Sequence, residues 1–259
     1  MNSTAEAEFE KYAQLGAYHW RDIGGHWIYH NAFNAERYRR VLRAAAPLAG
    51  FRVLDYGCGD GALLGWISRA VGSNGEAVGL EPNEEGRAAA RHMLSRHSLP
   101  ARLCASPQEL ESGSFDRVIC SEVIEHVADV EGLLRDIHRV LKPDGLAVLT
   151  TPIRLTEVPE EPSHVREWFP SEFAALFEAG PFHLRRHEQV IPSATTEVFF
   201  WRPRFLLRIP VFRVLCNVLS IYGGIDSLSW LAMRPRLFMT QLVMLEKRAI
   251  GGPEVGPLP

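Results

Sequence analysis

Glycines crowd one short stretch of the chain, VLDYGCGDG at residues 53–61, directly after an apolar run. The glycines that let the backbone turn tightly against a bound group are Gly57, Gly59 and Gly61. Acidic residues beside them would repel a phosphate, so the pattern disfavours a dinucleotide and accepts a cation. Glu81 ends the next apolar run, where a carboxylate can bind both hydroxyls of a ribose. Together these features predict a nucleoside ligand that carries a positive charge.

Two further stretches hold residues that could do chemistry. In SEVIEHV, Glu122, Glu125 and His126 fall at positions i, i+3 and i+4 and would share one face if a helix begins there. In HVREWFPSEF, His164 is a candidate general base, because histidine is the side chain used most often in that role. The alternative is that His164 and Glu167 form the cap of the helix that follows.

The elements that would position these residues alternate regularly along the chain. Apolar runs expected as strands lie at residues 51–56, 76–81, 101–105, 115–121 and 145–152. Helix-length segments that end at a glycine or proline separate them. The alternation predicts an α/β fold with a doubly wound, mostly parallel sheet, helices on both faces, and ligands at the carboxyl ends of the strands. A helix at 170–180 and two late strands at 183–191 and 238–248 are expected to follow.

The composition limits the class of protein. The 259 residues are 46% hydrophobic, enough for the core of one α/β domain, and the net charge of −3 gives no overall field for nucleic acid. The four cysteines form no CxxC pair, so neither a zinc site nor a disulfide framework is predicted. No signal-peptide pattern and no run of about 18 uncharged apolar residues is present. We therefore expect a cytoplasmic protein without a nucleic-acid partner.

Four motifs in order, VLDYGCGDG, VGLEPN, SFDRVICSEVIEHVAD and VLKPDGLAVLTTP, resemble those of the class I S-adenosylmethionine-dependent methyltransferases. The similarity covers roughly residues 50–152. It implies a Rossmann-like sheet of seven strands with one antiparallel strand, which agrees with the two late strands. It also implies S-adenosylmethionine as the cofactor and S-adenosylhomocysteine as the product.

The resemblance assigns the methionine part of the cofactor to the glycine loop and the ribose to Glu81. Pro82 or Asn83 would flank the adenine, and Ser106 and Gln108 stand where the family often has an acidic residue near the adenine amino group. Arg37 is expected as a partner of the cofactor carboxylate, with a surface position as the alternative. The complete expected set is Arg37, Asp55, Gly57, Cys58, Gly59, Gly61, Glu81, Pro82, Asn83, Ser106, Gln108, Ser121 and Glu122.

The segment before the glycine loop, residues 9–42, looks like the lead-in of the ubiquinone-biosynthesis O-methyltransferases. We expect residues 1–45 to form a helical cap on a methyltransferase domain at 46–259. Aromatic residues of the cap would contact the cofactor or an aromatic substrate, or would pack as an amphipathic helix pair on the domain. The aromatic residues expected at the substrate are Tyr18, Trp20, Trp27, Tyr29, Trp168 and Trp201.

Methyl transfer from a sulfonium is an in-line displacement, so the protein mainly aligns the reactants and removes a proton from a hydroxyl acceptor. The catalytic residues expected are Glu125, His126 and His164. In the enzymes that the chain resembles, the residues matching Glu122, Glu125 and His126 are taken to hold a divalent metal such as Mg²⁺. The alternative is that Glu122 lies at the cofactor, His126 packs over it, and no metal binds.

Residues 193–236 combine dense apolar residues with an excess of arginine, opposed only by Glu197 and Asp226. The arginines are Arg202, Arg204, Arg208, Arg213, Arg234 and Arg236. We expect a helical insertion that serves as a lid or substrate pocket. Alternatives are peripheral contact of residues 199–236 with the inner face of a membrane, a dimer contact, or a clamp for an anionic acceptor.

These observations predict an S-adenosylmethionine-dependent methyltransferase of a biosynthetic pathway. The acceptor is expected to be a small or lipid-like molecule that is methylated on a hydroxyl oxygen. N- or C-methylation of a sugar or natural product is an alternative, and so is a cofactor-binding regulatory subunit without catalysis. The sequence leaves a monomer and a homodimer equally open.

Overall fold

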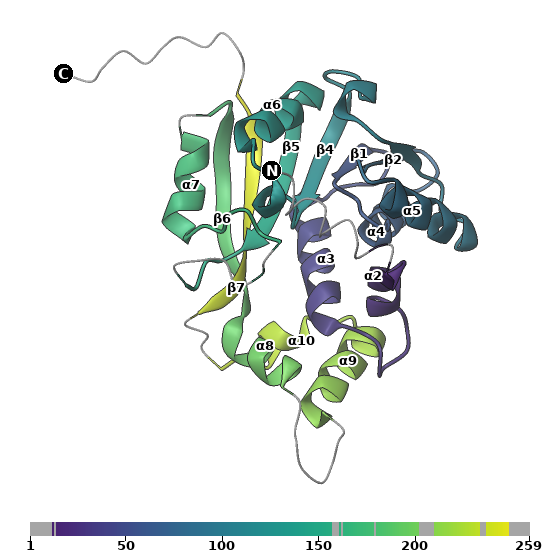
Figure 1. Ribbon diagram of the computed structural model, residues 1–259, viewed down its shortest axis with the longest axis vertical. Coiled ribbons are helices and arrows are strands. Elements are labelled where there is room, and N and C mark those ends of the chain that lie inside the picture. The colour runs from purple at the N-terminus through teal and green to yellow at the C-terminus, as the bar shows by residue number, and fades with distance from the viewer. Residues whose placement is uncertain are drawn as a thin grey trace, which may run out of the picture.

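The computed structural model describes residue 12 and residues 14–156, 161, 163–178, 180–201, 210–233 and 237–248. Its centre is a seven-stranded sheet with the strand order β3-β2-β1-β4-β5-β7-β6 (Figure 1). The strands are β1 Arg52–Tyr56, β2 Glu76–Leu80, β3 Arg102–Cys104, β4 Phe115–Ser121, β5 Leu141–Pro152, β6 Phe182–Pro192 and β7 Phe238–Lys247. Only β7 runs antiparallel to its neighbours. The predicted fold is confirmed, although β5 begins earlier than expected because Leu141 already pairs with Phe115.

Helices follow the strands as the alternation of the sequence predicts. The helices are α2 Tyr18–Asp22, α3 Ala32–Ala45, α4 Ala62–Val71, α5 Glu84–Arg96, α6 Val130–Val140, α7 Pro170–Glu178, α8 Ser193–Phe200, α9 Val211–Gly223 and α10 Ser227–Trp230, with short 3₁₀ turns η1 Pro107–Glu109 and η2 Ile124–His126. Neighbouring strand residues point to opposite faces of the sheet, so each face has its own core. Val53 packs with α3, α4 and α5 on one face, and Leu54 packs with α6 and α7 on the other.

The described part of residues 193–236 forms α8, α9 and α10, as the expected helical insertion requires. In Figure 1 these helices lie together beside one end of α3, beyond the edge of the sheet. α8 follows directly on the last residue of β6, which is parallel to β5 because both pair antiparallel with β7. The insertion therefore stands at the carboxyl edge of the sheet. The boundaries of the cap and of the domain remain predictions.

In the part of the chain that the structure describes, no helix has both the length and the apolar character needed to span a membrane. The four cysteines are buried and free.

Candidate functional site

A cavity of about 310 Å³ lies at the carboxyl ends of β1 and β4. The glycine loop after β1 and the turn after β4 form two of its walls, and α3 and the N-terminal cap close the others. Parallel α/β sheets bind ligands at this position because strand ends and helix starts leave a crevice there. We refer to it as the cofactor cavity.

The glycine loop needs its glycines for two different reasons. Gly57 and Gly59 line the cavity with φ angles of +78° and +53°, in the left-handed region that side chains disfavour. A Cβ atom on Gly57 would lie 2.5 Å from a methyl group of Val123, and one on Gly59 would collide with the Tyr12 hydroxyl. Gly61 also has a positive φ, and its missing Cβ makes room for Ala90 of α5, whereas Gly61 is not among the lining residues of the cavity.

Glu81 ties the loop to the end of β2. One carboxylate oxygen accepts a hydrogen bond from the Gly59 amide and the other accepts from the Asn83 amide, each at 2.9 Å. The side chain is buried beside the glycine loop, and both of its oxygens are held in fixed positions by these two amides. Asn83 is the N-cap of α5, where its side-chain oxygen accepts from the Gly86 amide.

The interior of the cofactor cavity holds buried charges that the protein only partly pairs. Arg37 and Glu122 form an ion pair of 3.2 Å between Nη1 and Oε2. The Asp55 pKa rises to about 8 because burial disfavours the anion, and the charges of Glu81 and Asp60 add to this effect. Buried atoms of cavity residues that have no hydrogen-bond partner are Arg37 Nε, Asp55 Oδ2, Glu122 Oε1 and Glu125 Oε1.

These unpartnered atoms fit a zwitterionic ligand with a net positive charge. Arg37 offers a donor to a carboxylate, and Asp55 offers an acceptor to an ammonium group. Glu122 adopts a φ angle of +57°, which is unusual for a residue with a side chain and is held by a hydrogen bond from its amide to Thr150. The methionine part of S-adenosylmethionine has the charges that this wall requires.

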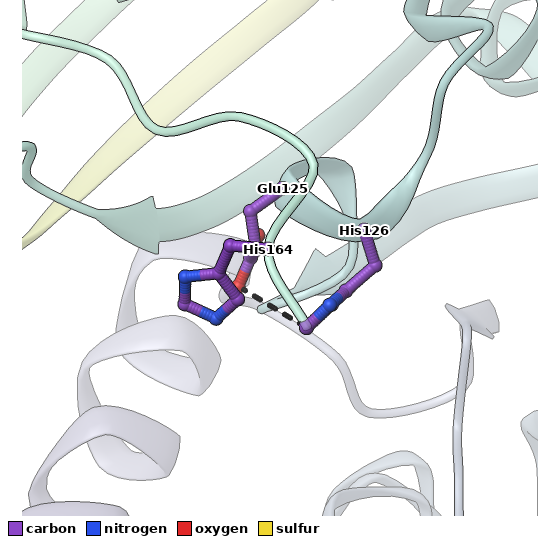
Figure 2. A group of neighbouring side chains, drawn as sticks. All are labelled: Glu125, His126 and His164. Carbon is purple, nitrogen blue, oxygen red and sulfur yellow. Dashed lines mark ion pairs between the residues drawn. The ribbon is translucent and has the colours of Figure 1, made fainter. Parts of the chain in front are cut away.

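Three side chains that line the cavity lie close together, as Figure 2 shows. Glu125 and His126 come from the turn after β4, and His164 comes from the segment after β5. One carboxylate oxygen of Glu125 and one ring nitrogen of each histidine lie within 4.8 Å of one another. The carbonyl of Glu125 accepts hydrogen bonds from the amides of Val165 and Arg166, which hold the His164 segment in place.

Glu125 is fully buried, and Thr151 donates a hydrogen bond of 3.0 Å to its Oε2. The Glu125 pKa rises to about 8, mainly because burial disfavours the anion and also because the neighbouring charge of Glu122 repels it. His126 Nδ1 lies 3.0 Å from the Ser163 carbonyl, so this nitrogen carries the proton when the ring is neutral.

A second cavity of about 340 Å³ adjoins the first and shares Pro152, Glu161 and His164 with it. We refer to it as the acceptor cavity. Its other described lining residues are Ile153, Leu155, Glu167 and Met239. Here His164 Nδ1 lies 2.5 Å from a carboxylate oxygen of buried Glu167. His164 therefore stands on the wall between the two cavities with its orientation fixed by a carboxylate.

The structure brings together most of the predicted cofactor residues. Those that line the cofactor cavity are Arg37, Asp55, Gly57, Cys58, Gly59, Ser121 and Glu122. Glu81 joins them through the Gly59 amide. Pro82, Asn83, Ser106 and Gln108 are not among the lining residues, and Ser106 instead caps η1 in a capping box with Glu109.

The predicted aromatic contacts fare differently, because only Tyr18 lines the cavity. Trp20 is buried in the core, where its indole donates to the Asp60 carbonyl and stacks on His97. Trp168 is fully buried against Phe173. The structure thus places these two tryptophans in the protein interior, and it leaves Trp27, Tyr29 and Trp201 exposed and away from the cavity lining.

Several lining residues were not predicted from the sequence. These are Tyr12, His19, Asn34, Tyr38, Asp60, Leu63, Pro152 and Glu161. Asp60 was within the glycine motif, and its carboxylate accepts from the His19 amide and pairs with the His19 ring, which joins the cap to the loop. Tyr12 could have been suspected from its place before the aromatic run of the cap, but only the fold shows that it reaches Gly59.

The group of possible metal ligands in the structure differs by one residue from the group expected from the sequence. Glu122, Glu125 and His126 do not share a helical face, because the chain forms a 3₁₀ turn at Ile124–His126, and Glu122 pairs with Arg37. The group that the described residues bring together is Glu125, His126 and His164. Two imidazoles and one carboxylate do not match Mg²⁺, which prefers oxygen ligands in an octahedral arrangement. The residues present therefore do not fit magnesium.

Comparison with known proteins agrees with this geometry. A family model described as a methyltransferase domain matches residues 28–195, which is more than half of the chain. The ubiquinone biosynthesis O-methyltransferase of Bradyrhizobium diazoefficiens is 33% identical over 157 residues, which are 56% of this chain and 61% of that protein. The enzyme of the same name from Xanthomonas oryzae pv. oryzae is 37% identical over 149 residues, with coverages of 56% and 61%.

Solved structures match a larger part of the chain at lower identity. Phosphoethanolamine N-methyltransferase 2 of Haemonchus contortus, in complex with S-adenosyl-L-methionine, has a TM-score of 0.63 at 17% identity and covers 92% of this chain and 58% of its own. A putative methyltransferase in complex with the Trm112 activator of Haloferax volcanii has a TM-score of 0.61 at 18% identity, with coverages of 93% and 98%. At this identity the matches show the fold.

The matched region spans about three fifths of the length of the curated relatives. The sheet order, the glycine loop with Glu81, and the family match over residues 28–195 agree with one another. The chain belongs to the methyltransferase-domain family, and its resemblance to the class I S-adenosylmethionine-dependent methyltransferases is confirmed.

Proposed function

We propose that this chain transfers a methyl group from S-adenosylmethionine to a hydroxyl oxygen of a small or lipid-like acceptor. The observation that carries the proposal is the position of His164, on the wall between two adjoining cavities and in contact with the Glu167 carboxylate. One cavity has the charges for the cofactor, and the other has room for an acceptor. The names of the curated relatives support oxygen as the methylated atom.

When bound, the cofactor would supply an electrophilic methyl group: the acceptor oxygen would bond to the methyl carbon in line as the C–S bond breaks, and S-adenosylhomocysteine would be the leaving group. The residues of this chain bind and orient the two reactants. Arg37 and Asp55 hold the charged groups of the methionine part, and Glu81 accepts from the ribose hydroxyls. Pro152, Glu161 and His164 line both cavities, so the acceptor oxygen would meet the methyl group beside these residues.

His164 removes the proton of the acceptor hydroxyl. Glu167 accepts a hydrogen bond from Nδ1, which leaves Nε2 as the basic nitrogen and stabilises the imidazolium that forms. An amine acceptor that arrives neutral also loses a proton after methylation, but the attack itself does not need a base. The His164–Glu167 pair therefore favours a hydroxyl over an amine acceptor.

The acceptor cavity also favours a neutral molecule. Its described lining combines the apolar side chains of Pro152, Ile153, Leu155 and Met239 with two carboxylates, Glu161 and Glu167. Anionic acceptors would meet these carboxylates and would lose binding energy by repulsion. A neutral ring or chain with a hydroxyl group fits this lining.

A panel of acceptors tests the proposal directly. The protein is incubated with S-adenosylmethionine and one acceptor at a time: catechol, a catechol with a carboxylate on its ring, neutral sugars or primary amines. Methylated products are identified by mass spectrometry. We expect O-methylation of neutral hydroxyl compounds and at least about tenfold lower turnover for the carboxylate-bearing analogue. Products methylated only on nitrogen or carbon would overturn the assignment to oxygen, and cofactor binding without any product across a wide panel would favour a regulatory subunit.

A further inference from the structure

The side chains of Glu125, His126 and His164 have the character of metal ligands, although not of ligands for magnesium. They are neighbours in Figure 2, and within the described part of the chain they are close enough together to share one ion. Two imidazoles and one carboxylate form the donor set of known zinc sites, and such mixed nitrogen and oxygen sets suit transition metals. We refer to these three residues as the Glu125 cluster.

Hydrogen bonds from the second nitrogen of each imidazole orient the two rings. His126 Nδ1 lies 3.0 Å from the Ser163 carbonyl, and His164 Nδ1 lies 2.5 Å from a carboxylate oxygen of Glu167. Both acceptors place the proton on Nδ1, so the lone pair of each neutral ring is on Nε2. Histidines that bind metals donate their other nitrogen to a carbonyl or a carboxylate in this way. Both rings therefore already have the second hydrogen bond of a metal-binding histidine.

Glu125 contributes a buried acceptor that the protein does not satisfy. Its side chain is 1% exposed, and Thr151 donates to Oε2, but Oε1 has no hydrogen-bond partner. His126 Nε2 lies 3.9 Å from Oε1, which is too far for a hydrogen bond. A buried carboxylate oxygen without a partner is costly, and a cation held between Oε1 and the imidazole nitrogens would satisfy it.

The separations within the Glu125 cluster are close to those around a zinc ion. With bonds of about 2.1 Å, two ligand atoms of a tetrahedral zinc ion lie about 3.4 Å apart. The distance of 3.9 Å between Glu125 and His126 is near this value, and all three ligand atoms lie within 4.8 Å. The rings of His126 and His164 are partly exposed, so a small rotation of each closes the set. All three residues line the cofactor cavity, through which an ion can enter.

We propose that the Glu125 cluster binds a transition-metal ion of the zinc class and that the bound ion blocks methyl transfer. The ion takes the Nε2 lone pair of His164, which is the lone pair that removes the acceptor proton. This second half of the proposal rests on the function proposed above, whereas binding of the ion does not. Micromolar zinc is therefore expected to inhibit the protein at concentrations at which magnesium has no effect.

Calorimetry on the metal-free protein, without cofactor or acceptor, tests the site itself. We expect Zn²⁺ to bind at least about a hundredfold more tightly than Mg²⁺. His164→Ala removes a ligand and should weaken zinc binding by at least about a hundredfold, and Glu167→Gln, which removes the charge that orients the ring, should weaken it by about tenfold. His92→Ala, an exposed histidine on α5, is the matched control and should bind zinc as the wild type does. Melting curves check that every variant is folded.

The two halves of the proposal fail in different ways. Zinc that binds the wild type no more tightly than magnesium, or that binds His164→Ala equally well, would overturn the site whatever the acceptor is. Turnover of the methylated acceptor is then followed as zinc rises, and we expect it to fall in proportion to the occupancy measured by calorimetry and to return with EDTA. Turnover that stays constant or rises while the site fills would overturn the inhibition and would remove His164 from proton transfer.

Discussion

The cofactor cavity and the acceptor cavity meet at His164 but are built from different parts of the chain. The cofactor cavity rests mainly on loops that directly follow β1 and β4, so its residues lie beside recognisable strands. The acceptor cavity combines the segment after β5 with Met239 of β7, which are far apart in sequence. Polar groups without partners mark the first cavity, and an apolar lining with one oriented histidine marks the second.

This difference separates two kinds of function. In the proposed function, binding of the cofactor depends on charges and glycines that are the same whichever acceptor is methylated. Selection of the acceptor would depend on side chains that only the tertiary fold brings together. Variants that affect one cavity alone should therefore separate cofactor affinity from turnover.

The largest effect is expected for His164→Ala. Loss of the proposed base should lower kcat by about 10² to 10⁴, while the Kd for S-adenosylmethionine changes by no more than about twofold. Turnover is measured by mass spectrometry and affinity by calorimetry. His92→Ala, an exposed histidine on α5, is the matched control and should leave both quantities unchanged. Turnover retained in His164→Ala would remove this residue from the catalytic step.

A smaller loss is expected for Glu167→Gln, which keeps the shape of the side chain and removes its charge. Turnover should fall by about tenfold to a hundredfold, and the pH profile of kcat should move, since Glu167 acts through the His164 ring. Glu161→Gln changes another carboxylate of the same cavity and serves as the control. Equal effects of the two variants would indicate a general charge effect instead of a positioning role.

The charge of Asp55 gives a prediction on stability. Folding raises its pKa to about 8, so between about pH 4 and pH 8 the folded protein retains a proton that the unfolded chain releases. Asp55 therefore makes the unliganded protein less stable as pH rises through this range. Asp55→Asn should raise the melting temperature by a few degrees at pH 8, which corresponds to about 1–2 kcal/mol of stability, and by less at pH 5. The same variant should weaken cofactor binding. A melting difference that does not depend on pH would contradict this.

The smallest effect is expected from metal removal. Two imidazoles and one carboxylate do not fit magnesium, so treatment with EDTA should change turnover by less than about twofold. Activity that disappears with EDTA and returns with added Mg²⁺ would show that another set of ligands forms when the substrates bind.

The sheet and the glycine loop of the cofactor cavity could be predicted because both depend on the pattern of neighbouring residues in the sequence. Apolar runs placed the strands within a few residues, and Asp55, Gly57 and Gly59 stand where a strand end requires them. The contact of Gly61 with Ala90 of α5 could not be predicted, because spacing along the chain does not show which helix packs against the loop.

The positions of the aromatic residues expected at the substrate were harder to predict, because burial depends on tertiary contacts. Trp20 and Trp168 are aromatic side chains of the kind that line substrate pockets. Trp20 nevertheless packs against Gly65 of α4, and Trp168 packs in the core near Phe173. Tyr12 was missed for the opposite reason, since only the folded cap brings it to Gly59. The buried side chains of α9 include Asn217 and Ser220, and their partners Trp27 and His30 lie about 190 residues earlier in the chain.

Isothermal titration of S-adenosylmethionine into the wild type and into Glu81→Ala tests the central claim most directly. Glu85→Ala, an exposed carboxylate on α5, is the control, and melting curves check that the Gly59 loop remains folded. We expect micromolar binding by the wild type and by the control, and a loss of tenfold or more, about 1.4 kcal/mol, in Glu81→Ala. Absence of binding by the wild type, or equal binding by Glu81→Ala, would contradict the assignment of the cofactor cavity.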